Sequence, residues 1–214
     1  MVVVDNFPAL MSGLVVTVAL TAATMMVALV VGIVVALARL SSFWPFRAVA
    51  YIYTELFRTL PLLVLLWWFH WSLPILSGVS FPRFLTAIVV FSLNISAVQA
   101  EAYRAGMLSI APSQRQAGLA LGMRPWQVMR RVLLPQALIR IMPLTGTNWV
   151  SLFKDTALVS LIAVPELMYQ GRAIATTTFR AVEVLTAVAV IYFVVVYPQA
   201  RLVNHVYARL SSHD

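Results

Sequence analysis

Residues 114–127 read QRQAGLALGMRPWQ, and residues 132–137 read VLLPQA. Together they form the one long polar stretch of an otherwise apolar chain. The stretch contains arginines at 115, 124, 130 and 131 and no acidic residue. Because charged side chains are costly inside hydrocarbon, we expect this segment to lie outside a bilayer.

Proline and glycine predict the local structure of this stretch. Pro112 can open a helix, because the missing N–H is tolerated in the first turn. Gly122 can close that helix in a left-handed conformation, and Pro125 can open a second helix. The sequence therefore predicts a short helix, a tight corner and another short helix.

The first of these helices has a small apolar face. Ala117, Ala120 and Leu121 fall on one side at helical spacing. A small apolar knob surrounded by arginine and glutamine suits a groove on a partner protein. A solvated loop with a helix lying on the surface explains the same pattern, and the spacing alone does not separate the two.

Composition predicts an all-α, polytopic membrane protein with a single domain over residues 1–214. Hydrophobic residues make up 62% of the chain and charged residues 10%, whereas soluble domains average about 45–50% and 25%. A net charge of +8 would suggest nucleic acid binding in a soluble protein. Here we assign it to arginines beside the membrane and expect no nucleic acid partner.

Several kinds of chemistry are excluded. The chain has no cysteine, and its three histidines are scattered, so neither a thiolate nor a histidine-cluster metal site is predicted. Lys154 is the one lysine, and no glycine-rich phosphate loop precedes it. Any ATP must therefore be bound by another subunit. The uncharged apolar run near the N-terminus is too long for a secretory signal, so we expect it to remain as an anchor.

Five apolar stretches reach the length of about 20 residues that a membrane-spanning helix needs. They cover residues 7–38, 48–76, 84–100, 141–165 and 184–200. Within the second stretch, Trp67, Trp68 and Trp71 are typical of a membrane interface, and the Leu73–Pro74 step is expected to end the helix.

The arginine distribution predicts the orientation. With the N-terminus outside, three arginines fall in outer segments: Arg83, Arg172 and Arg180. Ten fall in inner segments: Arg39, Arg47, Arg104, Arg115, Arg124, Arg130, Arg131, Arg140, Arg201 and Arg209. Positive residues gather on the cytoplasmic side, so we expect the C-terminus and the polar loop, about residues 109–138, to be cytoplasmic.

Charged residues within the spans are candidate functional groups. Glu55 and Arg58 are three residues apart and can pair on one helix face, as can Glu101 and Arg104. Both pairs could lie close to the cytoplasmic interface. A purely structural ion pair near the headgroups explains them as well as a function does.

Lys154 and Asp155 fall near the middle of the fourth stretch, and Asn94 near the middle of the third. Adjacent residues on a helix do not face each other, so Lys154 and Asp155 each need a separate partner. An ammonium, a carboxylate and an amide together suit a zwitterionic solute. A network that merely holds helices together is the alternative.

The polar loop resembles the EAA loop of the membrane subunits of bacterial ABC importers. That family has Glu-Ala-Ala, then Gly, then Ile-x-Leu-Pro at fixed spacing, and this chain has QAG at 116–118, Gly122 and VLLP at 132–135. ALG at 120–122 and LPQA at 134–137 resemble the polar amino-acid branch, the histidine/glutamine/arginine-type permeases. So do ELFR at 55–58 followed by PLLV at 61–64, LN at 93–94, and KDT at 154–156.

Some positions depart from the family pattern. Gln116 replaces the leading glutamate, and Gly118 the second alanine. RTLP at 58–61 stands where Arg-Gly-Thr-Pro is common. Val98 and Ala157 replace a tyrosine and a serine, which makes their surroundings less polar.

The resemblance implies the permease fold of type I ABC importers in a bacterial inner membrane, with about five spans and a cytoplasmic coupling helix. It implies a second permease subunit, identical or different, and an ATPase dimer that binds ATP and Mg²⁺. It also implies an external solute-binding protein and alternating-access import of a polar or charged amino acid. The chain itself would be no enzyme.

The resemblance also assigns residues to two roles. The expected substrate pathway contains Asn94, Asp155, Lys154, Arg58 and Glu101. The expected ATPase contact contains Gln114, Gln116, Ala117, Gly118, Ala120, Leu121, Gly122 and Pro135. The alternatives are a channel or secondary transporter in which Lys154, Asp155 and Glu101 relay ions, and a permease half whose partner alone binds substrate.

Overall fold

The computed structural model describes the backbone of residues 2–211 and the side chains up to residue 208; Arg209, one of the residues used for the orientation, lies beyond these side chains. The described chain is helical and forms no strand, which confirms the all-α prediction. The α-helices are α1 (Val2–Asp5), α2 (Phe7–Leu40), α3 (Trp44–Thr59), α4 (Leu62–Trp67), α5 (Leu73–Ser77), α6 (Arg83–Leu108), α7 (Pro112–Ala120), α8 (Pro125–Val128), α9 (Leu134–Asp155), α10 (Leu167–Thr178) and α11 (Ala181–Ser211). Two π-helical segments, η1 (Trp68–Ser72) and η2 (Met129–Leu133), and the 3₁₀ segment η3 (Thr156–Ile162) complete the chain.

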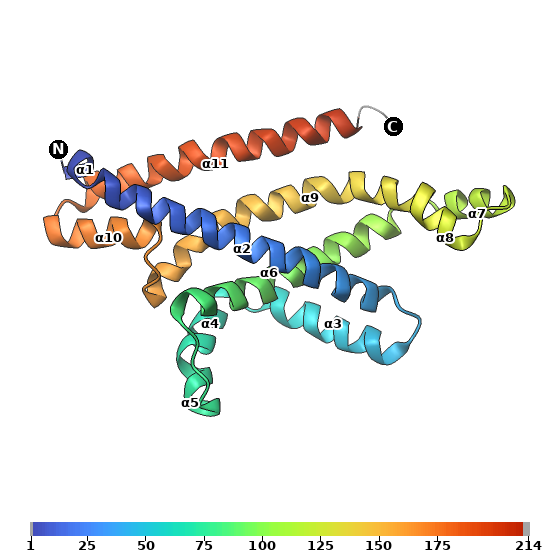
Figure 1. Ribbon diagram of the computed structural model, residues 1–214, viewed down its shortest axis with the longest axis horizontal. Coiled ribbons are helices and arrows are strands. Elements are labelled where there is room, and N and C mark those ends of the chain that lie inside the picture. The colour runs from blue at the N-terminus through green and yellow to red at the C-terminus, as the bar shows by residue number, and fades with distance from the viewer. Residues whose placement is uncertain (1, 212–214) are drawn as a thin grey trace.

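The long helices α2, α6, α9 and α11 extend along the long axis of the molecule (Figure 1). Helix α2 packs along α6, and their contact forms the centre of the fold. Leu20, Val90, Phe91 and Leu152 are fully buried there. Helix α1 lies at one end of the molecule, and α11 runs from that end toward the other side (Figure 1).

Three helices are long and apolar enough to cross a membrane: α2, α6 and α11 within the described residues. Helix α3 and residues 62–77 form a fourth candidate, which is bent by 101°. Helix α9 has 22 residues but contains Pro143 and more polar side chains. The helix count therefore agrees roughly with the predicted five spans.

The second predicted span differs from a straight helix. The chain breaks at Leu60, which adopts an extended conformation (ψ 134°) before Pro61. A residue before proline is driven out of the helical region, and this explains the break. The expected end at Leu73–Pro74 is wrong, because Pro74 lies in the first turn of α5, where it is tolerated.

The fourth predicted span also differs. Helix α9 begins at Leu134, seven residues earlier than expected, and its α-helical part ends at Asp155. The 3₁₀ segment η3 follows and ends at Ala163 in a left-handed conformation (φ 57°). Lys154 and Asp155 therefore lie at the junction between two helical segments, α9 and η3.

Helices α6 and α9 approach closely at Gly106, and this contact generates a prediction. A Cβ atom at Gly106 would lie 2.4 Å from Cγ1 of Ile141. Gly106→Val should overpack this contact and cost about 1–3 kcal/mol, lowering the thermal midpoint in detergent. Ala105→Val is the matched control, because Ala105 is exposed on the same helix. Equal losses in both variants would contradict the packing role.

Candidate coupling loop and polar pathway

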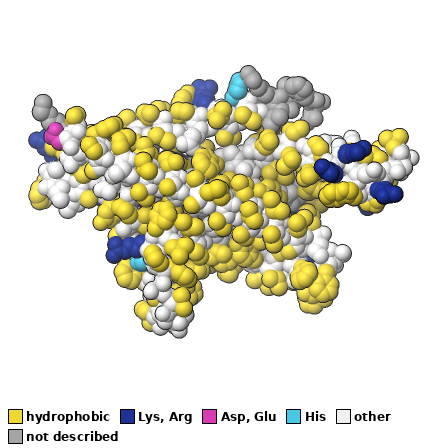
Figure 2. Space-filling model, in the orientation of Figure 1, with side chains coloured by type: hydrophobic (Ala, Val, Ile, Leu, Met, Phe, Trp, Pro, Cys, Tyr) yellow, Lys and Arg dark blue, Asp and Glu magenta, His cyan; other side chains and the backbone are white. Residues whose placement is uncertain are grey.

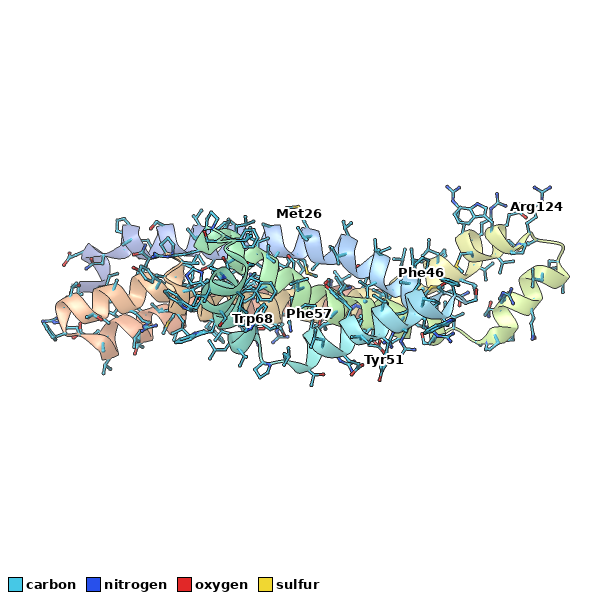
Figure 3. The ribbon with its side chains drawn as sticks, turned by 90° about the horizontal axis from the view of Figure 1, so that it is seen from below. Met26, Phe46, Tyr51, Phe57, Trp68 and Arg124 are labelled. Atoms are coloured by element: carbon cyan, nitrogen blue, oxygen red, sulfur yellow. The ribbon has the colours of Figure 1, made fainter. Side chains whose placement is uncertain are left out.

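Helices α7 and α8 form the far tip of the molecule (Figure 1). As expected, α7 begins at Pro112, and Gly122 follows its end with φ +78°. Helix α8 begins at Pro125, and its first turn is stabilised because the Arg124 N–H donates to Oε1 of Gln127 (2.8 Å). Arg124 projects at the tip (Figure 3). The predicted helix–corner–helix is therefore confirmed.

One predicted coupling residue faces inward. Gly118 is buried, and a Cβ atom there would lie 2.9 Å from Cγ2 of Val128. This glycine allows α7 to pack against the residues that follow the corner. Its place is therefore in the internal packing of the loop rather than on its outer surface.

The other coupling candidates are exposed. Those on and just after α7 are Gln114, Gln116, Ala117, Ala120, Leu121 and Gly122. Leu121 is 82% exposed and Trp126, which the sequence reasoning missed, is 67% exposed. Pro135 is also exposed but lies in the first turn of α9, where its role is to begin that helix. The tip therefore presents apolar side chains among arginines.

The predicted Glu101–Arg104 pair is present, and a second arginine joins it. Arg104 donates to both carboxylate oxygens of Glu101. Arg39 contacts the same carboxylate at 3.4 Å and donates to Oγ1 of Thr54 at 2.9 Å. Arg39 comes from α2 and Thr54 from α3, so the cluster connects α2, α3 and α6. Sequence reasoning missed Arg39 because it ends an apolar run far from Glu101.

The second predicted pair is more exposed. Arg58 donates to Oε1 of Glu55 at 3.1 Å, and both side chains are about two-fifths exposed. Such surface pairs contribute little stability, about 0–1 kcal/mol. Arg58 is therefore accessible for another ligand at little cost.

Asn94 has a partner that the sequence did not reveal. Its Nδ2 donates to the backbone carbonyl of Phe57 at 2.6 Å. Phe57 lies four residues before Pro61, which has no N–H to complete the helical hydrogen bond. Asn94 on α6 therefore replaces the hydrogen bond that proline removes from α3. Because Phe57 directly precedes Arg58, this contact also brings Asn94 close to the backbone at Arg58.

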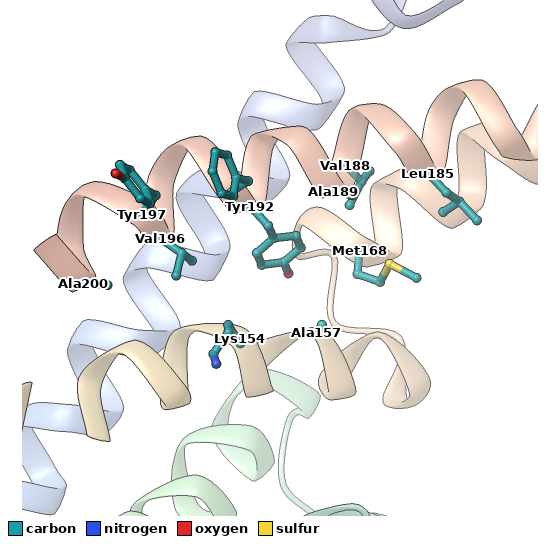
Figure 4. A pocket seen from close by; sticks show the side chains of 11 residues that line it. Lys154, Ala157, Met168, Leu185, Val188, Ala189, Tyr192, Val196, Tyr197 and Ala200 are labelled. Carbon is teal, nitrogen blue, oxygen red and sulfur yellow. The ribbon is translucent and has the colours of Figure 1, made fainter. Parts of the chain in front are cut away.

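Lys154 and Asp155 make no ion pair or hydrogen bond with any described side chain. Lys154 lies on the wall of a groove of about 650 Å³ between the end of α9 and helices α10 and α11. In Figure 4 its ammonium turns away from α11, whereas Tyr192 points toward the groove. The other walls are almost entirely apolar.

The five predicted pathway residues thus occupy three places in the subunit. Glu101 belongs to the arginine cluster, Asn94 and Arg58 lie near the break after α3, and Lys154 and Asp155 lie at the α9–η3 junction. The prediction of one shared polar site within this chain is not supported by any contact between the three groups.

The burial of the two largest buried polar side chains, Gln99 and Glu166, was not predicted. Gln99 is fully buried; its Nε2 donates to Thr145, and Asn148 donates to its Oε1 at 2.9 Å. These bonds join α6 to α9. Glu166 is also fully buried, caps the start of α10, and accepts a hydrogen bond from Tyr192 at 3.0 Å. The sequence signal for this cap was an acidic residue, Glu166, directly after Pro165 and before the helix-forming residues of α10.

Comparisons with known proteins agree over most of the chain. A family model described as the binding-protein-dependent transport system inner membrane component matches residues 28–212. The glutamate/aspartate import permease protein GltK of Escherichia coli is 34% identical over 98% of this chain and 96% of its own length. The arginine transport system permease protein ArtQ of Bacillus subtilis is 32% identical over 99% and 96%. The glutamine transport system permease protein GlnP of Escherichia coli is 38% identical over 78% and 77%.

Solved structures share the same fold. A chain in a crystal structure of an amino acid ABC transporter with histidines is 33% identical, with a TM-score of 0.91 and 96% of each chain covered. A chain of the MetNI methionine ABC transporter, in an inward-facing conformation, has a TM-score of 0.80 at 22% identity. It covers 96% of this chain and 98% of its own length, and it supports the fold alone.

The Asn94 contact generates a second prediction. Asn94→Leu keeps a similar volume but leaves the Phe57 carbonyl without its donor. We expect a loss of about 1–3 kcal/mol, the cost of an unsatisfied buried polar group, measured as a lower thermal midpoint in detergent. Thr147→Val is the control, because Thr147 is exposed and its hydroxyl donates to a carbonyl of its own helix. Unchanged stability of Asn94→Leu would contradict the proposed compensation for Pro61.

Proposed function

Because the chain belongs to the family of inner membrane components of binding-protein-dependent transport systems, it is a permease subunit of an amino acid ABC importer, and we propose that it imports a polar or charged amino acid. The match over residues 28–212 carries this conclusion. The names of the relatives at 32–38% identity, which are glutamate/aspartate, arginine and glutamine permeases, support the substrate class. The subunit does not itself catalyse a reaction.

The exposed face of α7 is the proposed contact for the ATPase subunits. It lies at the tip of the molecule, and the apolar side chain of Leu121, which directly follows α7, is 82% exposed there. A groove on the ATPase would bury Leu121, and the surrounding arginines would meet acidic residues. ATP and Mg²⁺ would be bound entirely by the ATPase pair, and its closure would displace α7.

Leu121→Asp tests this contact. Burying a leucine contributes about 1.5–3 kcal/mol, so the variant should weaken ATPase association about tenfold or more. The measurements are co-purification of the ATPase and substrate uptake in vesicles. Val182→Asp is the matched control, because Val182 is also 82% exposed but lies on α11. Normal association of Leu121→Asp would exclude α7 as the docking element.

The remaining partners follow from the family and from the geometry. A second permease subunit, identical or different, is proposed because the family of binding-protein-dependent importers supports such a partner. An external solute-binding protein would deliver the amino acid at the end opposite α7. We propose that the N-terminus is outside and the C-terminus inside, since ten arginines against three favour this orientation. Transport then proceeds by alternating access.

Within that pair, Asp155 is the proposed ligand of the substrate ammonium. It is half-buried and forms no ion pair with a described side chain, although it lies beside Lys154. A buried carboxylate needs a compensating group. A substrate ammonium supplies one, while Lys154 and Arg58 are the cations available for its carboxylate. Asn94 retains its side-chain oxygen as an acceptor.

Asp155→Asn keeps the shape and removes the charge. A hydrogen bond to a charged group contributes about 1.5–3 kcal/mol, so KM for uptake should rise about 10- to 100-fold. Assembly and basal ATP hydrolysis should be retained. Glu183→Gln is the control, because Glu183 is an exposed carboxylate at the start of α11. An unassembled Asp155→Asn subunit would make Asp155 structural, and unchanged uptake would exclude it from the site.

A further inference from the structure

Three arginines from three helices surround one hollow. Arg39 at the end of α2, Arg47 on α3 and Arg104 on α6 line a cavity of about 390 Å³. Trp44, Ala48 and Tyr51 form the rest of its wall. None of these residues belongs to the α7 surface or to the Asp155 region.

The hollow has more positive than negative charge. Glu101 accepts from both Arg39 and Arg104, so one carboxylate serves two guanidinium groups. Arg47 is exposed and has no ion pair with any described side chain. Three cations against one anion leave an excess of two positive charges, which favours an anionic ligand.

The geometry of Arg39 is fixed before any ligand arrives. Its side chain is only 11% exposed and donates to Thr54. Its guanidinium also lies over the ring of Tyr51, with 4.9 Å between the Cζ atom and the ring centroid. A guanidinium held in this way loses little freedom when it binds an anion.

Aromatic side chains surround the same corner. Phe43, Trp44 and Phe46 are 57%, 68% and 62% exposed, and the rings of Phe43 and Phe46 meet edge to face at 5.1 Å. Figure 2 shows hydrophobic atoms gathered at this α2–α3 corner. The apolar run of α2 ends at Arg39, so the corner lies at the level where hydrocarbon meets headgroups. Aromatic residues prefer this level.

We propose that this hollow binds the phosphate headgroup of an anionic phospholipid from the leaflet beside α7. Arginines bind phosphate oxygens in a bidentate manner, and basic pockets between membrane helices bind such headgroups. The exposed aromatic side chains would contact the glycerol and upper acyl chain, which a free phosphate ion lacks. This site is separate from the proposed substrate site at Asp155 and rests on the proposed function only for the identity of the leaflet.

Native mass spectrometry of the assembled, detergent-purified transporter tests the site with added phosphatidylglycerol and phosphatidylcholine. We expect phosphatidylglycerol to bind more tightly. Arg47→Gln should weaken its binding about fivefold, the effect of one basic residue near an anionic surface. Arg47→Lys should retain most of the binding. Arg172→Gln, an exposed arginine on α10, should leave it unchanged.

Three outcomes would overturn the proposal. Equal phosphatidylglycerol binding by the Arg47→Gln and Arg172→Gln variants would exclude the hollow. Complete displacement of the lipid by soluble glycerol phosphate at equal concentration would identify a site for small anions instead. Loss of a permease subunit from the Arg47→Gln assembly would identify this corner as an interface between copies. Because Arg47 is exposed and forms no ion pair with a described side chain, the variant should fold. Loss of phosphatidylglycerol binding with retained amino acid uptake would support the lipid site, whereas absence of uptake by the unmodified transporter would contradict the proposed function and leave the lipid measurement unaffected.

Discussion

Backbone hydrogen bonding in a medium without water is the constraint on which this structure depends. Inside a bilayer each N–H and C=O must find a partner within the protein. A long helix satisfies its own backbone N–H and C=O groups, except at its ends. The places where a helix breaks therefore show which side chains supply the missing hydrogen bonds. After α3 the Pro61 ring removes one donor, and Asn94 supplies another from α6. Before α10 the Glu166 carboxylate caps the free N–H groups of Met168 and Tyr169. In both places a side chain supplies the missing hydrogen-bond partner.

The elements that could be predicted are those whose signals are local. Apolar runs indicate where α2, α6 and α11 lie, because a membrane-spanning helix can be recognised from its own length and composition, without knowing which helices pack against it. Pro112, Gly122 and Pro125 define the loop at the tip, since each restricts its own backbone. The Glu101–Arg104 pair follows from helical spacing alone.

The features that could not be predicted depend on which helices touch. Arg39 and Glu101 are 62 residues apart in sequence, yet their side chains meet. In the sequence Gly118 belongs to an apparently exposed motif, but in the structure it is buried against the side chain of Val128. The 101° bend after α3 combines a local signal, Pro61, with the direction that packing against α6 imposes. For the same reason, candidate pathway residues could be chosen by residue type but not assembled into a site.

The Gln99 network has a mechanical consequence. Gln99 is bonded to Thr145 and Asn148, so α6 and α9 are joined by directional bonds as well as by the Gly106–Ile141 contact. The two helices therefore resist sliding past one another and act as one stiff lever with α7 and α8 at its end. Helix α6 has 26 residues and is about 39 Å long. A tilt of about 5° would displace one end relative to the other by about 3–4 Å over this length. A small rotation at the tip would therefore become a shift of several ångströms at the opposite end.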